Sequence, residues 1–447
     1  MSLRESASAA WFLLHCASAA AANGVVHHVD PGHYLAALRA LRPGHELHLA
    51  PGQYLEGLPV QFINGTAEAP IVITGPATGA AASLLARAGH NTVSLRNASH
   101  LVIRNLTLDG QGIPVDAVKC EGDAQWAHHI RLENLKVVGH GAHQQVVGIS
   151  TKCPAWNWVV RRNIIEGAGT GMYFGDSDGS APFVAGLIEY NLVTESLGYN
   201  LQIKHQQERD PIPGMPVTPQ ATIIRHNVFS KGQHASRGDF ARPNVLVGHW
   251  PLRGSGADDL YLIYGNFFFQ NPTEALFQGE GRIALYNNLF VNAAQDALHI
   301  QPHNDRPRYV RVLYNTVLTR AAGITLIRRP EDEQPDAIVA GNIVFAARPV
   351  AGYRSGDNLI GDYAAARRYL LNPYAAPPQL DLGLSEGEYP LPLTTFAQEE
   401  NLRALSLDFD GQVRTEGVPG AYGDRTRDRQ WALQLQRKPR TKTVGPR

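Results

Sequence analysis

Residues 102–108 read VIRNLTL, in which strand-forming residues flank an asparagine. The same pattern occurs nine times and ends with VAGNIVF at residues 339–345. Its asparagines are Asn105, Asn134, Asn163, Asn191, Asn227, Asn266, Asn288, Asn315 and Asn342. Successive intervals are 29, 29, 28, 36, 39, 22, 27 and 27 residues. This spacing, with high strand propensity and little helical periodicity, is typical of the coils of a parallel β-solenoid.

The recurring asparagine has two physical uses in such a solenoid. It tolerates the left-handed backbone angles of the turns between short strands. Its amide can also bond to the equivalent amide one coil away, which builds a ladder along the solenoid. We therefore expect these asparagines to stack.

Composition narrows the class of protein. The chain has 447 residues with 40 basic and 40 acidic side chains, so its formal net charge is zero. Proteins that bind nucleic acid usually carry a basic excess, so we expect no nucleic-acid partner. Charged residues make up 18% and apolar residues 44%, the proportions of a folded chain. No later apolar run approaches the ~20 residues that span a bilayer, so we expect no membrane span.

The three cysteines are too few for a disulfide framework. Cys120 and Cys153 precede comparable coils and are expected to lie near each other. In an exported protein they could form a disulfide. Two buried free thiols are the other alternative.

The chain ends differ from the repeat region. Residues 1–22 carry Arg4, an apolar stretch and then small residues that end at Ala22. This pattern predicts a signal peptide and hence a secreted or periplasmic protein, with a disordered tail as the alternative. Residues 23–350 are predicted to form one β-helix with its N-terminal cap, and we expect a monomer. Residues 431–447 are predicted to be a basic, flexible, solvated tail.

Two further segments flank the repeats. Leu35, Leu38 and Leu41 recur at helical spacing and Pro43 follows as a stop. A short helix there would cap the open end of the solenoid, as repeat proteins require. Residues 351–430 lose the pattern and are expected to pack on the last coils or cap them.

Two long intervals between asparagines contain loops. Gln206–Gln220 is rich in proline and cannot be a regular strand. The second loop is Gly232–Arg242. Long loops in a regular array are often functional. We expect both loops to rise beside the same face.

Aligning the coils on their asparagines also aligns a strand about ten residues later. Alternate residues of a strand point to opposite faces, so one set faces the interior. The inward set is Met172, Phe174, Leu201, Ile203, Val245, Val247, Leu298, Ile300, Ile324 and Leu326. The outward set is Tyr173, Asp176, Lys204, His205, His249, Glu280, His299, Gln301, His303 and Arg328. With coils roughly 4.8 Å apart, the outward set should form a polar strip about 20–25 Å long, enough to follow several sugar units.

The ends of the repeat region resemble a known family. Residues 33–75, which contain GHELHLAPGQYLEGLPVQF, resemble the opening of right-handed parallel β-helix proteins that act on polysaccharides. The closest likeness is to the chondroitinase B and alginate lyase group, polysaccharide lyase family six. DFDGQVR at residues 408–414, with Gly420, Ala421 and Tyr422, is similar to a closing segment common in β-helix proteins. The likeness covers residues 25–350 and implies an all-β, single-stranded, right-handed parallel β-helix.

The resemblance also implies an activity, the cleavage of a uronic-acid-containing polysaccharide by β-elimination. In the family a lysine removes the C5 proton, an arginine one coil later assists the leaving group, and calcium commonly neutralises the carboxylate. Lys204, in NLQIKHQ, stands at the position of that lysine. We predict that Lys204 is the catalytic base and His249 the acid. The predicted substrate-binding residues are His205, Glu280, His299, Gln301, His303, Arg328, Tyr173 and Asp176.

The chain departs from the family at two places. Gly248 stands where the family has the arginine, although His249 matches the residue after it. Leu197 and Tyr199 replace the acidic calcium ligands expected before the lysine. The sequence therefore assigns no metal or cofactor, and calcium stays an open alternative. The residues that could hold the substrate carboxylate instead are Arg225, Arg242 and Arg328.

Other chemistries remain open for the same strip. A zinc site would use His205, His249, Glu280 and His303, although these are strung along a strip. Asp176 and Asp178 could bind calcium or form a turn.

Two alternative functions follow. QPHND at residues 301–305 partly resembles the Asp-Pro-His-Asp motif of mannuronan C5-epimerases, so a uronan C5-epimerase is one alternative. A non-catalytic glycan-binding or surface β-helix protein is the other, in which Lys204 would be an ordinary solvated residue.

Overall fold

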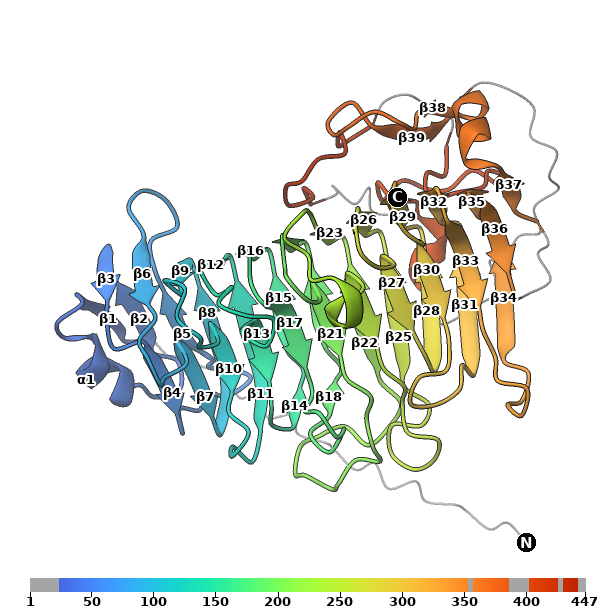
Figure 1. Cartoon of the computed structure of the whole chain (residues 1–447). Helices are drawn as coiled ribbons and strands as arrows, with labels where there is room; N and C mark the ends of the chain where they lie inside the picture. The colour runs from blue at the N-terminus through green and yellow to red at the C-terminus, as the bar shows by residue number, and fades with distance from the viewer. Residues whose placement is uncertain (1–23, 353–356, 386–401, 425–428, 441–447) are drawn as a thin grey trace, which may run out of the picture.

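The structure, a computed structural model, describes residues 24–352, 357–385, 402–424 and 429–440. The predicted signal peptide lies outside these residues. Successive coils contribute strands to three long parallel sheets, so the chain winds into a right-handed parallel β-helix (Figure 1). The predicted fold class is confirmed. In the described part of the chain, no helix is long and apolar enough to cross a membrane.

The three sheets are named I, II and III in the order in which each coil visits them. Sheet I contains β1 (Val26–Val29), β2 (Glu46–Leu49), β5 (Ile71–Thr74), β8 (Ala98–Arg104), β11 (Ala127–Glu133), β15 (Val159–Arg161), β19 (Leu187–Glu189), β22 (Ala221–Arg225), β25 (Leu260–Tyr264), β28 (Arg282–Tyr286), β31 (Tyr309–Leu313) and β34 (Asp336–Ala340), with β14 (Ala155–Trp156) and β18 (Phe183–Val184) at its side. Sheet II contains β3 (Gly52–Tyr54), β6 (Ala82–Leu85), β9 (Leu106–Asp109), β12 (Lys136–Val138), β16 (Ile164–Glu166), β20 (Leu192–Thr194), β23 (Val228–Ser230), β26 (Phe267–Phe269), β29 (Leu289–Asn292), β32 (Thr316–Thr319), β35 (Ile343–Phe345) and β37 (Leu359–Gly361). Sheet III contains β4 (Leu58–Gln61), β7 (Val93–Arg96), β10 (Val118–Cys120), β13 (Val147–Thr151), β17 (Thr170–Phe174), β21 (Leu201–Ile203), β24 (Val245–Val247), β27 (Phe277–Gly279), β30 (Leu298–Ile300), β33 (Ala322–Leu326) and β36 (Arg348–Ala351).

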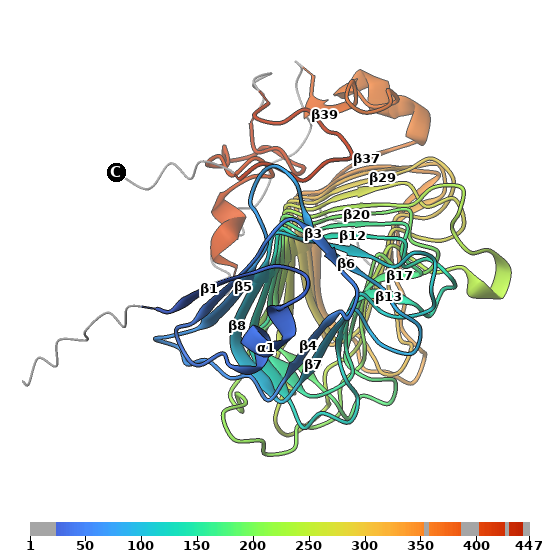
Figure 2. The same ribbon diagram turned by 90° about the vertical axis from the view of Figure 1, so that its left-hand side faces the viewer.

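The three sheets enclose the interior of the solenoid (Figure 2). A column of stacked apolar side chains fills this interior. All ten residues predicted to point inward are buried. Like residues stack on successive coils: the rings of Phe229 and Phe268 are 5.4 Å apart, and those of Phe268 and Phe290 are 4.5 Å apart. Each coil therefore buries its apolar face only against its neighbours, as expected of a solenoid.

An asparagine ladder runs inside the turn between sheets I and II. It consists of Asn163, Asn191, Asn227, Asn266, Asn288, Asn315, Asn342 and Asn358. Each Nδ2 donates to the Oδ1 of the next asparagine at 2.8–3.0 Å. Seven of the nine repeat asparagines form this ladder, and Asn134 donates to Asn105 at 3.3 Å in a separate, exposed pair, so the predicted stacking is confirmed. Asn358 extends the ladder beyond the region that the repeats define.

The backbone role expected of the ladder asparagines is wrong. The left-handed residue of each turn is the one before the ladder position, such as Arg162 (φ 58°) and Tyr190 (φ 56°). Asn105 (φ 57°) and Asn134 (φ 53°) occupy that earlier position and do not belong to the buried ladder. The kink at the preceding residue turns the chain between the two sheets, and the ladder side chain then points inward.

Replacing Asn266 by alanine should lower the free energy of unfolding by about 2 kcal/mol, because partners in the ladder lose their buried hydrogen bonds. The Oδ1 of Asn266 accepts from the backbone and side-chain amides of Asn227 at 2.9 and 3.0 Å. Urea unfolding followed by circular dichroism measures the effect. Asn134→Gly is the matched control, since Asn134 is exposed and glycine adopts its left-handed backbone. Equal losses in both variants would contradict a stabilising ladder.

The N-terminal cap is the helix α1 (Tyr34–Arg39), which covers the open end of the solenoid (Figure 2). Tyr34 and Leu38 are buried, and Leu41 is buried just after the helix ends. The Tyr34 ring lies edge-on to Tyr54 at 4.9 Å. The predicted capping helix is confirmed, although it is shorter than the leucine spacing suggested.

Cys120 and Cys153 form a disulfide, with Cα atoms 5.9 Å apart. Both residues are completely buried. Of the two alternatives that the sequence left open, the structure therefore has the bonded one.

Most of the segment after β37 packs along the outer face of sheet II (Figure 1). Leu402 and Leu405 pack instead against Ala284, Tyr286 and Leu313 of sheet I. The segment contains a 3-10 helix (Tyr363–Arg368), the antiparallel pair β38 (Leu370–Asn372) and β39 (Asp381–Leu384), and a 3-10 turn (Arg403–Ser406). Its buried residues Phe409, Tyr422 and Trp431 belong to one cluster with Phe267 and Leu289 of sheet II. The resemblance of residues 408–422 to a closing segment thus corresponds to a covering of the solenoid flank.

The prediction of a solvated tail is wrong for residues 431–440. Leu433 is buried, and Lys438 is only 1% exposed. The Nζ of Lys438 donates to the carbonyl oxygen of Gly265 at 3.2 Å and to that of Phe409. Arg437 donates to the carbonyl oxygen of Arg162. Backbone acceptors on the solenoid attract these cations, a contact that charge patterning alone does not predict.

Candidate functional site

The register of sheet III arranges its outward side chains in two rows. The first row contains Tyr173, Gln202, Leu246, Gln278 and His299, which lie opposite one another on successive strands. The second row follows two residues later and contains Lys152, Gly175, Lys204, Gly248, Glu280 and Gln301. The predicted strip therefore exists, but glycines and glutamines occupy several of its places.

Lys204 stands in an opening of the second row. Its neighbours one coil away on either side are Gly175 and Gly248, which have no side chains. A Cβ at Gly248 would lie 2.3 Å from the backbone nitrogen of His205, so no larger residue fits there. Burial lowers the pKa of Lys204, although Glu280 and Asp176 oppose that shift.

Lys152 is a site residue that the sequence did not predict. It lies two coils before Lys204 in the same row. Its Nζ is 3.3 Å from the centre of the Tyr173 ring and 3.5 Å from the carbonyl oxygen of Gly175. Burial lowers its pKa to about 8. Tyr173, which was predicted to contact substrate, therefore has its ring against the ammonium group of Lys152.

His205 and His249 stack beside Lys204 with ring centres 5.4 Å apart. The Nε2 of His205 lies 3.1 Å from the carbonyl oxygen of Asp178. The Nδ1 of His249 lies 2.9 Å from the carbonyl oxygen of Trp250. That contact requires a proton on Nδ1, so Nε2 is the His249 nitrogen that can exchange a proton with a bound molecule.

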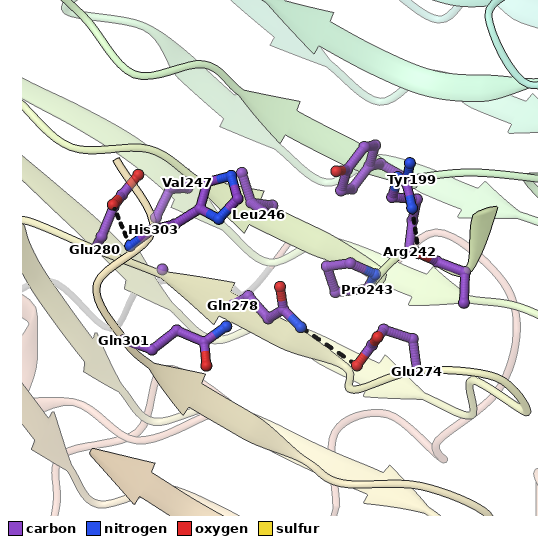
Figure 3. Close-up of a pocket in the computed structure, with 12 residues that line it drawn as sticks. Tyr199, Arg242, Pro243, Leu246, Val247, Glu274, Gln278, Glu280, Gln301 and His303 are labelled. Carbon is purple, nitrogen blue, oxygen red and sulfur yellow. Dashed lines mark hydrogen bonds between the residues drawn. The ribbon is translucent and has the colours of Figure 1, made fainter. Parts of the chain in front are cut away.

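A hollow of about 320 Å³ lies along sheet III (Figure 3). Lys204, His205 and His249 are not among its wall residues. Its walls include Tyr199, Arg242, Leu246, Glu274, Gln278, Glu280, Gln301 and His303. Three of these were predicted as substrate-binding residues: Glu280, Gln301 and His303. Arg242 lies over the Tyr199 ring at 6.0 Å, which brings one guanidinium to the wall. Leu246 and Gln278 reach the wall because they stand in the first row of sheet III. Arg242 reaches it because the Gly232–Arg242 loop ends there.

Glu280 has a structural task within the hollow. Its Oε2 accepts the backbone N–H groups of His303, Asn304 and Asp305 at 2.8–3.0 Å. The carboxylate is 3% exposed. Glu280 thereby fixes the loop that carries His303 (Figure 3).

The remaining predicted residues lie at the ends of the strip. Asp176 accepts the backbone N–H groups of Gly179 and Ala181 at 3.1 and 2.9 Å, so it forms a turn. His299 pairs with Asp296 at 2.9 Å. Arg328 is exposed and donates to nearby backbone carbonyls. None of these three residues lines the hollow.

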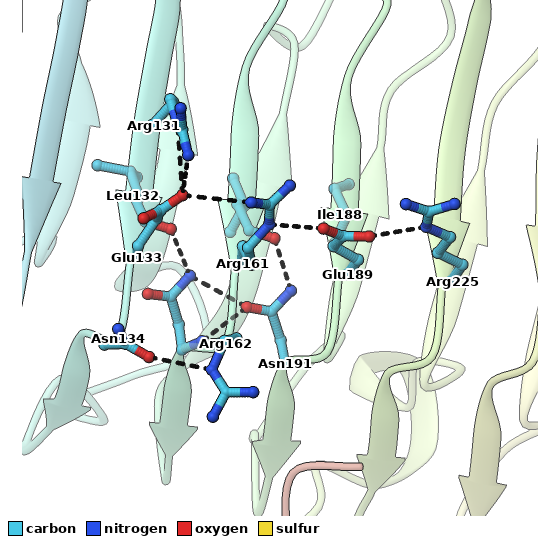
Figure 4. Close-up of polar contacts among 12 residues, drawn as sticks. Arg131, Leu132, Glu133, Asn134, Arg161, Arg162, Ile188, Glu189, Asn191 and Arg225 are labelled. Atoms are coloured by element: carbon cyan, nitrogen blue, oxygen red, sulfur yellow. Dashed lines mark hydrogen bonds and ion pairs between the residues drawn. The ribbon is translucent and has the colours of Figure 1, made fainter. Parts of the chain in front are cut away.

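Two predictions about charged groups are wrong. Arg225 lies on the outer face of sheet I, where it pairs with Glu189 at 2.7 Å, so it cannot serve the strip (Figure 4). It ends a ladder that also contains Arg131, Glu133 and Arg161 (Figure 4).

The hypothesis of a zinc site on the strip is also wrong. Among the described residues, His205, His249, Glu280 and His303 do not converge within the distance that one ion requires.

Calcium does not fit the hollow. The carboxylates on its wall are engaged, since Glu280 holds backbone donors and Glu274 accepts from the backbone of Ala275 at 2.8 Å. Arg242 adds a positive charge, and Tyr199 occupies a position where an acidic ligand was expected. Calcium needs six to eight oxygen ligands, which these residues do not offer.

The two loops leave the solenoid at different turns, so the expectation that they rise beside the same face is wrong. Gly232–Arg242 precedes β24 and borders the hollow. Gln206–Gln220 follows β21 and packs at the turn toward sheet I, where Met215 contacts the cluster of Trp156 and Val184. The loops therefore border sheet III from opposite ends of its strands.

The fold and this strip define a parallel β-helix protein with an open polar face on sheet III. No family model and no curated protein matches the chain by sequence. A solved PL6-family alginate lyase, AlyGC, is similar with a TM-score of 0.50 and 14% identity, over 93% of this chain and 59% of that one. A mutant of AlyGC has a TM-score of 0.47 and 16% sequence identity, over 75% of this chain and 51% of that one. The A-module of the mannuronan C-5 epimerase AlgE4 of Azotobacter vinelandii has a TM-score of 0.35 and 14% sequence identity, over 74% of this chain and 92% of that one.

The likeness to AlyGC with a TM-score of 0.50 shows a shared fold. The chain spans about half to three fifths of the length of the two AlyGC structures. The right-handed β-helix also hosts several chemistries, so the reaction has to be argued from the site.

Proposed function

We propose that the protein is a polysaccharide lyase that cleaves a uronic-acid-containing polysaccharide by β-elimination. The observation that carries this proposal is Lys204, a lysine with a lowered pKa in an open row, next to the stacked pair of His205 and His249. Arg242, on the wall of the hollow, is the cation that we assign to the substrate carboxylate. A lysine base, an imidazole acid and a cation for the carboxylate are the three groups that the reaction requires.

The steps follow from these positions. The substrate chain lies along sheet III, and Arg242 pairs with the carboxylate of the reacting sugar, which makes its C5 proton more acidic. The neutral amine of Lys204 removes that proton. The C5–H electrons form the C4=C5 double bond as the C4–O4 bond breaks, and His249, which for this step carries a proton on both ring nitrogens, donates the one on Nε2 to O4. Lys204 and His249 lie on neighbouring coils, one residue out of register, and we infer that both reach the same sugar ring.

The proposal extends to the compartment and the assembly. A disulfide between Cys120 and Cys153 is stable in oxidising compartments, which supports a secreted or periplasmic protein. We propose that it acts there as a monomer.

The test is incubation of the full chain with a panel of uronic-acid polysaccharides, with and without a chelator. We expect ultraviolet absorbance from the new C4=C5 double bond, and we expect it to survive the chelator because calcium does not fit the hollow. Changed sugar configuration without new absorbance would replace the proposal with a C5-epimerase. Binding without any chemical change would replace it with a glycan-binding protein.

A further inference from the structure

Three histidines meet on sheet I, away from the strip on sheet III. His100 belongs to β8, and His128 and His129 belong to β11 on the next coil. One ring nitrogen of each lies within 4.8 Å of the corresponding nitrogens of the other two. In the described part of the chain, no other group of three His, Cys, Asp or Glu residues converges in this way.

A backbone kink brings two of these rings together. His100 (φ 53°) and His129 (φ 54°) adopt the left-handed conformation, as do Asn157 (φ 56°) and Ala185 (φ 54°) at the same place in the next two coils. Histidine is less favourable than glycine or asparagine in this conformation. The two rings stack with centres 4.4 Å apart.

The ring nitrogens are arranged as ligands. The Nδ1 atoms of His128 and His129 face each other at 2.8 Å. The Nε2 of His129 lies 3.0 Å from the amide of Asn157. The atom of Asn157 that faces this Nε2 is Nδ2. Turning the amide of Asn157 over would place its oxygen there instead, so that Nε2–H donates to it and Nδ1 presents a lone pair to an ion. An outer hydrogen bond of this kind orients most metal-binding histidines.

The surroundings favour neutral rings. His128 stacks on Trp156 at 4.4 Å and lies 4.9 Å from Trp126. Burial lowers the pKa of His128 to about 4 and also lowers that of His129. A hollow of about 360 Å³ that His100 and His129 help to line gives access from solvent.

We propose that His100, His128 and His129 bind one divalent ion of the zinc class, with the fourth position open to water. Three imidazoles and one open position form a known zinc ligand set. Tetrahedral geometry requires nitrogen atoms about 3.3 Å apart, for Zn–N bonds of about 2.05 Å. The side-chain torsions next to the rings are soft enough for that adjustment. Calcium and magnesium are excluded because they require oxygen ligands. The ion would join β8 to β11 and so tie two coils together.

The test uses the full chain without a polyhistidine tag, after removal of metal with a chelator. Titration with Co²⁺, followed by its visible absorption and then by displacement with Zn²⁺, should show one saturable equivalent. His100→Asn and His128→Phe should each weaken the affinity at least tenfold, as loss of a ligand or its support does. Zn²⁺ should also raise the unfolding temperature of the wild type, because ligands stabilise the state that they bind.

The variants preserve the fold by design. Asparagine already occupies this backbone position at Asn157, and phenylalanine keeps the stacking on Trp156. His90→Asn, at an isolated exposed histidine, is the matched control and should bind as the wild type does. The proposal is overturned if no saturable equivalent appears, if both cluster variants bind like His90→Asn, or if Ca²⁺ competes equally. Polysaccharide cleavage does not enter these readouts, so the metal site and the lyase proposal can fail separately.

Discussion

Lys204→Ala should lower kcat on a confirmed polysaccharide substrate by about 100-fold or more while leaving binding largely intact, the scale expected for loss of a general base. Burial lowers the pKa of this lysine, which raises the fraction of neutral amine near pH 7. kcat should follow a bell-shaped pH profile, because the step needs neutral Lys204 and protonated His249 together. Steady-state kinetics on the responsive polysaccharide measure both effects. Lys136→Ala is the matched control, because Lys136 is exposed on β12 of sheet II.

A second variant sharpens this test. His249→Ala should lower kcat to a similar extent. The loss of kcat in the double variant should be much smaller than the product of the two single losses, since base and acid act in one step. If Lys204→Ala keeps most of its turnover, Lys204 is not the base. Lys152, in the same row, would then be the lysine to replace, together with His205 and His303.

Asp259→Asn should lower the free energy of unfolding by about 3–5 kcal/mol, the cost of leaving a buried charge without its partner. Asp259 pairs with Arg209, and their side chains are 0% and 1% exposed. Asp259 also accepts the backbone N–H of Gln220 at 2.8 Å, so one carboxylate holds both ends of the Gln206–Gln220 loop. Asparagine has nearly the same shape, so the loss reports the charge. Urea unfolding measures it.

The neighbouring residue supplies the control. Asp258 is 70% exposed and lies 3.9 Å from Arg282, so Asp258→Asn should change stability by less than about 0.5 kcal/mol. Limited proteolysis should cut the Gln206–Gln220 loop faster in Asp259→Asn than in Asp258→Asn. Equal stability in the two variants would show that the buried pair does not hold the loop.

The fold was predictable because a solenoid repeats local information. Each coil buries its apolar residues against the next coil, so the period of the asparagines and the alternation of the sheet III strands are visible in the sequence. The repeat pattern did not predict the place of Asn358 in the ladder. This residue continues the ladder from Asn342 after only 16 residues, without the strand pattern that marks the other repeats.

The candidate site was predictable only in part. Alternation placed Lys204, Glu280 and Gln301 on the outer face of sheet III. It did not reveal that Gly175 and Gly248 open the space around Lys204, because that depends on which residues lie opposite each other on neighbouring coils. Lys152 was missed for the same reason.

The sequence by itself determined the repeat, the inward and outward faces and the N-terminal cap, because period and alternation are local properties of a strand. Only the tertiary structure decided which charges meet. Arg225 pairs with Glu189 on sheet I, and Lys438 is buried against Gly265, 173 residues away. It also brought His100 to His129 from separate coils and folded one loop over the hollow. Such contacts join residues distant in sequence, and their strength depends on burial and geometry that no local pattern encodes.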